Sequence, residues 1–133
     1  QRADYVFAVE SAASSVRDLR RNMEGIDGEI EVIGGDSARE LPTLGHLDAL
    51  VVDPPRAGLA KGVAESIAAS KAERVAYVSC DPATWARDIA RFAEAGYELV
   101  RATPVDLFPQ TFHVETVSIL HRSSGRHTSH ETR

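Results

Sequence analysis

Short apolar runs alternate with longer stretches of helical periodicity along this chain. Residues 5–9 (Tyr-Val-Phe-Ala-Val) form a continuous apolar run, typical of a buried strand, and residues 11–23 then place apolar side chains on one helical face. The alternation of apolar runs and helical stretches continues to about residue 120. It predicts strands at 30–33, 49–52, 74–78, 98–104 and 114–120, and helices at 37–41, 59–70 and 84–95.

Strands that alternate with helices of this length predict an α/β fold with a mostly parallel sheet, and the closing strand pair predicts an antiparallel strand at one edge. We see no linker or internal repeat, so we expect one domain over residues 1–122. Residues 123–133 hold almost no apolar side chains and are expected to form a disordered tail. No apolar run approaches the roughly 20 residues that cross a bilayer, so we expect a cytoplasmic protein with no membrane partner.

Composition narrows the possible chemistry. The 133 residues are 43% hydrophobic and 26% charged, as in ordinary globular proteins. The formal net charge of −5 argues against a broad phosphate-binding surface on this part of a protein. The single cysteine, Cys80, excludes an intramolecular disulfide and a cysteine-cluster metal site, and we expect no metal. Cys80 therefore has either a packing role or a reactive one.

Polar residues follow the predicted strands at the points where each strand ends. Glu10, Asp36, Asp53 and Cys80 each come directly, or nearly so, after a buried run. Taken singly, such an acid is most often a helix cap or turn residue, and such a cysteine a small buried hydrophobe. Ligands of open α/β sheets bind outside the carboxyl ends of the strands. Four polar residues at such strand ends therefore favour a binding site at that edge of the sheet. Glu10 suits a ribose hydroxyl pair, although no G-x-G-x-x-G loop accompanies it.

Two further segments carry specific chemistry. Asp53-Pro54-Pro55-Arg56 is held extended by its prolines, and it forms either a rigid pocket wall for a planar ring or only a stiff connection. Cys80 precedes a predicted helix, whose positive end favours a thiolate. Glu115 ends a polar stretch from Asp106 and opens the last strand, which would direct it over the sheet edge.

Three segments together resemble the RNA 5-methyluridine (uracil-C5) methyltransferases. These are Asp-Pro-Pro-Arg-Ala-Gly at 53–58, Tyr-Val-Ser-Cys-Asp-Pro-Ala-Thr at 77–84, and Pro-Val-Asp-Leu-Phe-Pro-Gln-Thr-Phe-His-Val-Glu at 104–115. They occur in the family's order, and the resemblance runs over about residues 5–121. It implies a Rossmann-like class I fold, S-adenosylmethionine as methyl donor, and uridine in transfer RNA or 23S ribosomal RNA as substrate.

The resemblance also implies roles for single residues. Cys80 would be the nucleophile and Glu115 the base, while Glu10, Asp36 and Asp53 would contact the methyl donor. The thiolate would add to uracil C6, which makes C5 nucleophilic, and the carboxylate would finally remove the C5 proton. One departure is Asp81, where the family commonly has asparagine, because its charge beside the thiol should resist thiolate formation.

The family's first strand, glycine-rich donor loop, RNA-binding domain and any iron–sulfur cysteines have no counterpart before Tyr5. We therefore expect an N-terminally truncated catalytic domain that is inactive alone and self-associates through exposed strand edges. Two alternatives remain open, namely a catalytically dead binding or scaffold domain, and a methyltransferase for a small molecule or a protein. RNA cytosine-C5 methyltransferases use a second cysteine, which this chain lacks.

Overall fold

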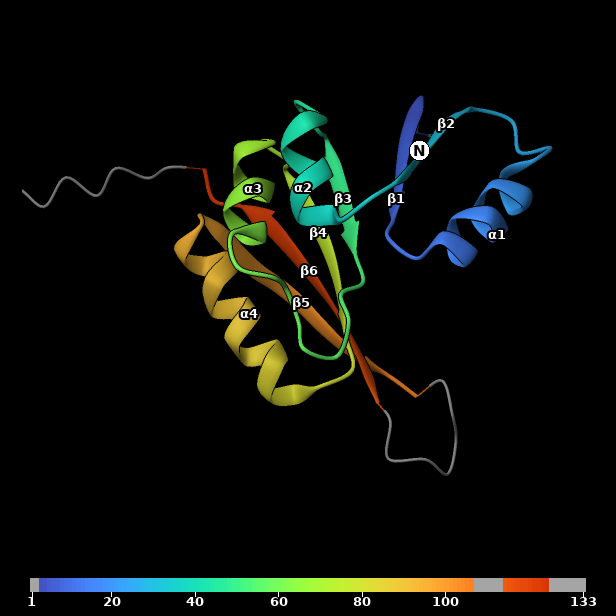
Figure 1. Ribbon diagram of the computed structural model, residues 1–133. Helices are drawn as coiled ribbons and strands as arrows, with labels where there is room; N and C mark the ends of the chain where they lie inside the picture. Colours follow the sequence, from blue (N-terminus) through green and yellow to red (C-terminus); the bar gives the residue numbers. More distant parts are fainter. Residues whose placement is uncertain (1–2, 107–113, 125–133) are drawn as a thin grey trace, which may run out of the picture. The chain divides into compact units, whose positions relative to one another are not determined.

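The computed structural model describes residues 3–106 and 114–124 of the chain (Figure 1). The polar stretch at 107–113 and most of the predicted tail, residues 125–133, lie outside the described residues. The chain divides into two compact units, residues 1–45 and 46–133, which we describe separately. The single domain expected over residues 1–122 stays a prediction.

The first unit is a parallel strand pair joined by a helical crossover. The strands pair in register from Tyr5 with Glu29 to Glu10 with Gly34, so both end at the same edge. Parallel strands need a crossover connection, and here a helix supplies it and packs its buried Val16 near Gly34. The elements are β1 (Tyr5–Glu10), α1 (Ala13–Met23), β2 (Glu29–Gly34), α2 (Ser37–Glu40) and a 3-10 turn, η1 (Leu41–Thr43).

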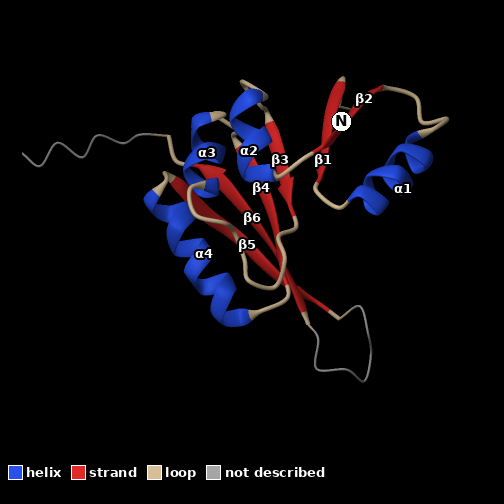
Figure 2. Ribbon diagram, viewed as in Figure 1, coloured by secondary structure: helices blue, strands red, loops and turns tan. Residues whose placement is uncertain are grey.

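The second unit is a four-stranded mixed sheet in the order β3-β4-β6-β5, shown in red in Figure 2. β3 and β4 are parallel, and β6 runs antiparallel to both β4 and β5. The antiparallel pairing expected at one edge is confirmed, with β6 inserted between β4 and the edge strand β5. The elements are β3 (Ala49–Val52), α3 (Val63–Ala69), β4 (Arg74–Ser79), α4 (Pro82–Glu94), β5 (Tyr97–Val105) and β6 (Glu115–Arg122).

The core of the second unit lies between its sheet and its two helices. Alternate residues of β4, among them Val75 and Tyr77, are fully buried, whereas the residues between them are more exposed, as expected for a strand with one covered face. Phe92 of α4 is buried between two tyrosines. Its ring meets Tyr77 and Tyr97 edge-on, with centroids 5.7 and 5.9 Å apart, an arrangement that aromatic quadrupoles favour.

The helix predicted at 59–70 is wrong at its beginning. α3 starts only at Val63, because Gly62 adopts a left-handed conformation with φ of 86°. Leu59 is buried in a loop instead, and its N–H bonds to the side chain of Asp88 rather than to a helical carbonyl. The helix predicted at 84–95 begins earlier, at Pro82, since proline is well tolerated in a first helical turn.

Candidate active site

The turn from β4 into α4 carries Cys80. β4 ends at Ser79, Cys80 is half-buried, and Asp81 is the N-cap of α4. The Asp81 carboxylate accepts a hydrogen bond from the Thr84 N–H at 3.0 Å. That bond, with smaller contributions from the Ala83 N–H, the Thr84 hydroxyl and the Arg56 charge, holds the pKa of Asp81 below its ordinary value. Asp81 is therefore a helix cap, a role that asparagine fills equally well.

The register between β4 and β6 brings Cys80 and Glu115 to the same end of the sheet. Ser79 at the end of β4 pairs with Thr116 in β6. Cys80 follows β4 directly beyond this last pair, and Glu115 is the residue that precedes Thr116 in β6. Glu115 also pairs with Val105 of β5, and it is half-buried.

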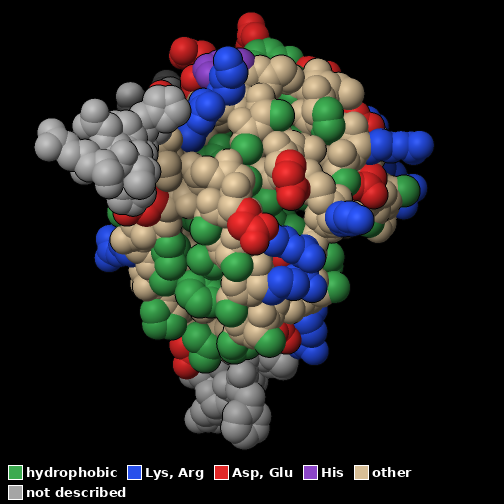
Figure 3. All heavy atoms as spheres, turned by 90° about the vertical axis from the view of Figure 1, so that its left-hand side faces the viewer, with side chains coloured by type: hydrophobic (Ala, Val, Ile, Leu, Met, Phe, Trp, Pro, Cys, Tyr) green, Lys and Arg blue, Asp and Glu red, His purple; other side chains and the backbone are tan. Residues whose placement is uncertain are grey.

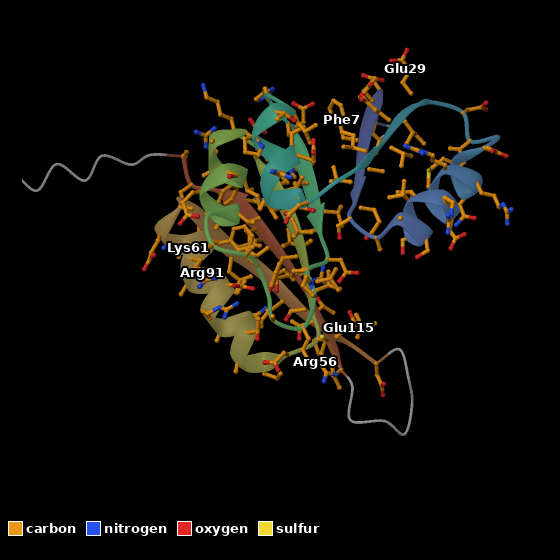
Figure 4. The ribbon with its side chains drawn as sticks, in the orientation of Figure 1. Phe7, Glu29, Arg56, Lys61, Arg91 and Glu115 are labelled. Carbon is orange, nitrogen blue, oxygen red and sulfur yellow. The ribbon has the colours of Figure 1, made fainter. Side chains whose placement is uncertain are left out.

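Asp53 lies at the same edge of the second unit. β3 ends at Val52, which pairs in parallel with Tyr77 of β4, so the carboxyl ends of both strands meet there. Asp53 is exposed and opens the proline-rich loop. The charge of Arg56 in this loop reaches Asp81, and Figure 4 shows the labelled side chains of Arg56 and Glu115 at this end of the unit.

The structure places Glu10 and Asp36 together at the carboxyl edge of the first unit. The Gly35 N–H bonds to the Glu10 carbonyl at 2.9 Å, which ties the ends of β1 and β2 together. One Glu10 carboxylate oxygen accepts from the Ala12 N–H at 3.0 Å, and one Asp36 oxygen accepts from the Ala38 N–H at 2.8 Å. Both acids therefore cap local backbone. Both also sit where a strand end can present a carboxylate oxygen to ribose hydroxyls.

The predicted site residues thus fall into two sets. The second unit brings Asp53, Cys80 and Glu115 to one sheet edge, and the first unit does the same for Glu10 and Asp36. Within residues 3–106 and 114–124, no His, Cys, Asp and Glu side chains gather in a group that could hold a metal ion. None of the helices in the described part of the chain is long and apolar enough to span a membrane.

Sequence reasoning missed a buried ionic cluster behind the proline-rich loop. Asp88 is fully buried in α4 and contacts Arg87 and Arg91, at 3.4 and 3.5 Å. Both arginines also donate to carbonyls of the loop that follows Asp53. The available signal was the spacing of Asp88 and Phe92, because residues four apart share a helix face and an acid on the apolar face needs partners.

Several solved structures of similar architecture are methyltransferases. The Pyrococcus abyssi tRNA (uracil-54, C5)-methyltransferase, solved with S-adenosyl-L-homocysteine, is 36% identical with a TM-score of 0.73, over 87% of this chain and 28% of that one. A SAM-dependent methyltransferase of Leishmania major, at 10% identity, shares the fold alone, with a TM-score of 0.62 over 88% of this chain and 55% of its own. The chain therefore has a Rossmann-like S-adenosylmethionine-dependent methyltransferase fold.

Sequence comparisons narrow this class to a family. The tRNA (uracil-5-)-methyltransferase family model matches residues 43–123, and the chain belongs to that family. Uncharacterised RNA methyltransferases of Caldanaerobacter subterraneus and Clostridium acetobutylicum are 37% and 40% identical, each over 92% of this chain. The chain spans 28% of the length of each of these relatives.

Proposed function

We propose that this chain carries the chemical centre of an enzyme that methylates uracil C5 in RNA through a covalent cysteine adduct. One observation carries the proposal, namely the pairing of Ser79 with Thr116, because Cys80 follows the first of these residues and Glu115 precedes the second at one end of the sheet. A nucleophile and a carboxylate at one sheet edge are the two groups that this substitution needs. The family membership supports the same reaction.

The two side chains act in a fixed order. The Cys80 thiolate adds to uracil C6, and the electrons of the C5–C6 double bond move onto C5 and the adjoining carbonyl. Bound S-adenosylmethionine supplies the methyl group that C5 then acquires. Glu115 removes the C5 proton, the C5–C6 double bond forms again, and the sulfur leaves C6 as a thiolate. The ring must leave its stack to reach Cys80, so the reaction requires base flipping.

For the methyl donor, we propose that Glu10, Asp36 and Asp53 form contacts. Each follows the carboxyl end of a parallel strand, where nucleotide ligands of α/β sheets bind. The half-buried Glu10 keeps one oxygen on the Ala12 N–H, which orients the carboxylate and leaves the second oxygen for a ribose hydroxyl.

The RNA substrate is proposed to be transfer RNA or 23S ribosomal RNA, and the location to be the cytoplasm. The solved relative from Pyrococcus abyssi acts on uracil 54 of a tRNA. Assays of the full-length protein on both RNA classes, with cell fractionation, distinguish these outcomes. Because this chain has a net charge of −5, we expect the rest of the RNA-binding surface to lie outside it.

The mechanism is tested with RNA that contains 5-fluorouridine, because fluorine at C5 cannot be removed as a proton and the adduct accumulates. In the full-length protein, Cys80→Ala should lose both methyl transfer and adduct. Glu115→Gln should form the adduct, even with ordinary RNA, and release it slowly. Glu94→Gln, which removes an exposed carboxylate of α4, is the matched control and should behave as the wild type.

Two results would contradict this mechanism. The first is an adduct in Cys80→Ala, and the second is normal turnover in Glu115→Gln, which would assign the base to another group. A wild-type protein that folds and binds the donor but neither forms an adduct nor methylates RNA would favour the binding or scaffold alternative. Methylation of a small molecule or a protein without adduct would favour the other alternative.

We also propose that the 133-residue chain self-associates through its strand edges and binds the donor weakly. β1 pairs only with β2, and β3 only with β4, within the described residues. Val6 and Val51 on these edges are 40% and 77% exposed, and such edges accept further strands. Light scattering tests this, with Val51→Lys expected to reduce association. Ile26→Lys, at an exposed apolar residue in a turn, is the control and should not. A monodisperse wild-type monomer with micromolar donor affinity would refute the proposal.

A further inference from the structure

A buried carboxylate joins α4, β4 and the loop that follows Asp53. Asp88 is fully buried. One of its oxygens accepts from the Leu59 N–H at 3.0 Å and from the Tyr77 hydroxyl at 2.5 Å. Its other oxygen faces Arg87 and Arg91, at 3.4 and 3.5 Å. Every partner of Asp88 therefore comes from the loop, from the sheet or from its own helix.

The two arginines hold the same loop from its carbonyl side. Arg87 donates to the Ala57 carbonyl at 2.6 Å, and Arg91, whose side chain is labelled in Figure 4, donates to the Leu59 carbonyl at 3.1 Å. Between these anchors, Gly58 is buried with φ of 83°, and a Cβ there would collide with side chains of α4. The loop backbone is thus hydrogen-bonded to α4 on both sides of a position at which only glycine fits.

Packing alone does not account for an acid at this position. A buried carboxylate loses its hydration, and its partners must replace that loss, whereas an apolar side chain of similar size would fill the core without it. What Asp88 adds is directional bonding to one loop amide and to two arginines. The arginines remain partly exposed, at 46% and 37%. Figure 3 views the side of Figure 1 on which α3 and α4 lie, and there Lys and Arg side chains lie next to Asp and Glu side chains.

We infer that Asp88 and Arg87 are positioning residues that hold the loop from Asp53 to Leu59 against α4, and so keep Asp53 and Arg56 at the edge that bears Cys80 and Glu115. The inference rests on the proposed function. α4 begins at the cap directly after Cys80, and the loop begins directly after β3. Bonds between the loop and α4 therefore fix the position of the loop relative to the nucleophile. In this role neither Asp88 nor Arg87 has to contact the substrate.

The primary test uses Arg87→Gln in the full-length protein, since Arg87 is half-exposed and its loss leaves the apolar core intact. Arg74→Gln is the matched control, because it removes an exposed arginine at the opposite end of β4. Two measurements are made, namely amide hydrogen exchange of residues 57–59 and the single-turnover rate of methyl transfer. Arg87→Lys tests rescue, since lysine can still donate to the Ala57 carbonyl.

We expect Arg87→Gln to exchange residues 57–59 at least about tenfold faster and to lower the transfer rate about 10- to 100-fold, as misplacement of groups by about 1 Å does. The RNA concentration that gives half the maximal single-turnover rate should stay within about threefold, because the inference assigns the loop a role at the reacting groups. Arg87→Lys should recover most of the rate. Asp88→Asn, which keeps an acceptor for Leu59 but places an amide against the arginines, should repeat both effects.

Several outcomes would overturn the inference. Unchanged exchange at 57–59 in both Arg87→Gln and Asp88→Asn would show that the cluster does not hold the loop. Faster exchange with an unchanged transfer rate would show that loop position does not matter for the reaction. If the wild-type protein forms no adduct and methylates no RNA, the proposed function fails by itself, while the exchange comparison still decides whether the cluster positions the loop.

Discussion

Replacing Tyr77 by phenylalanine isolates one hydrogen bond in the core of the second unit. Tyr77 is fully buried, and its hydroxyl donates to the Asp88 carboxylate at 2.5 Å. Burial, and then this carboxylate, raises the pKa of Tyr77, so the hydroxyl keeps its proton at any ordinary assay pH. Phenylalanine keeps the ring and its edge contact with Phe92, so the change removes the bond and little else.

The expected loss follows from the partners that remain. A hydrogen bond to a charged group contributes about 1.5–3 kcal/mol to the free energy of unfolding. Asp88 still accepts from the Leu59 N–H and faces its arginines, so the carboxylate does not become an unpaired charge. We therefore expect Tyr77→Phe to cost about 1.5–2 kcal/mol, near the lower end of that range.

Tyr97→Phe is the matched control for this prediction. Tyr97 is also buried and also meets Phe92 edge-on, but its hydroxyl donates to the carbonyls of Ala72 and Ile67, at 2.7 and 3.3 Å. Bonds between neutral groups contribute about 0.5–1.5 kcal/mol, so this substitution should cost less.

Urea unfolding of the chain, followed by fluorescence, measures both variants. Trp85 is the only tryptophan in the chain and lies in α4, so its emission reports on the second unit. A lower midpoint at an unchanged slope with urea assigns the effect to stability. The reasoning is refuted if Tyr77→Phe costs under about 0.5 kcal/mol, the smallest contribution usual even for a bond between neutral groups, or less than Tyr97→Phe.

Three further changes test single features. Gly58→Ala should lower the free energy of unfolding more than Gly62→Ala. Both glycines have positive φ, for which a loss of about 1–2 kcal/mol is expected, but of the two only Gly58 has no room for a Cβ. Equal urea midpoints of the two variants would contradict this. Asp81→Ala should lower the midpoint at pH 7, and Asp81→Asn, which keeps the cap oxygen without the charge, should lower it less. Folding depresses the pKa of Asp81, so the stabilisation by its carboxylate is present above about pH 4 and is lost as the pH falls through the pKa of the folded state. The difference in urea midpoint between the wild type and Asp81→Ala should therefore close in acid. A difference that stays constant with pH would show that the charge plays no part. Trp85→Phe removes the bond to the buried Ser118 hydroxyl, 2.7 Å long, and should cost about 1–3 kcal/mol in a thermal melt, whereas an unchanged melt would mean that the hydroxyl finds another partner.

The sequence by itself determined most of the secondary structure and the kind of chemistry. The strand predicted at 49–52 is confirmed to the residue, because a short apolar run ends at a proline-rich segment that cannot continue it. The helix predicted at 59–70 is confirmed only from Val63 on, because Gly62 turns left-handed and Leu59 bonds to a distant carboxylate. Local periodicity contains no information about such a partner.

Tertiary structure alone decided which groups meet. Cys80 and Glu115 lie far apart in the chain. They come to the same end of the sheet because Ser79 pairs with Thr116, and this register depends on β6 entering the sheet between β4 and β5. The sequence did not predict the role of Asp88 either, because an acid within a helix usually lies on a solvated face. Burial leaves this carboxylate only the loop, the sheet and two arginines as partners, and so fixes its position.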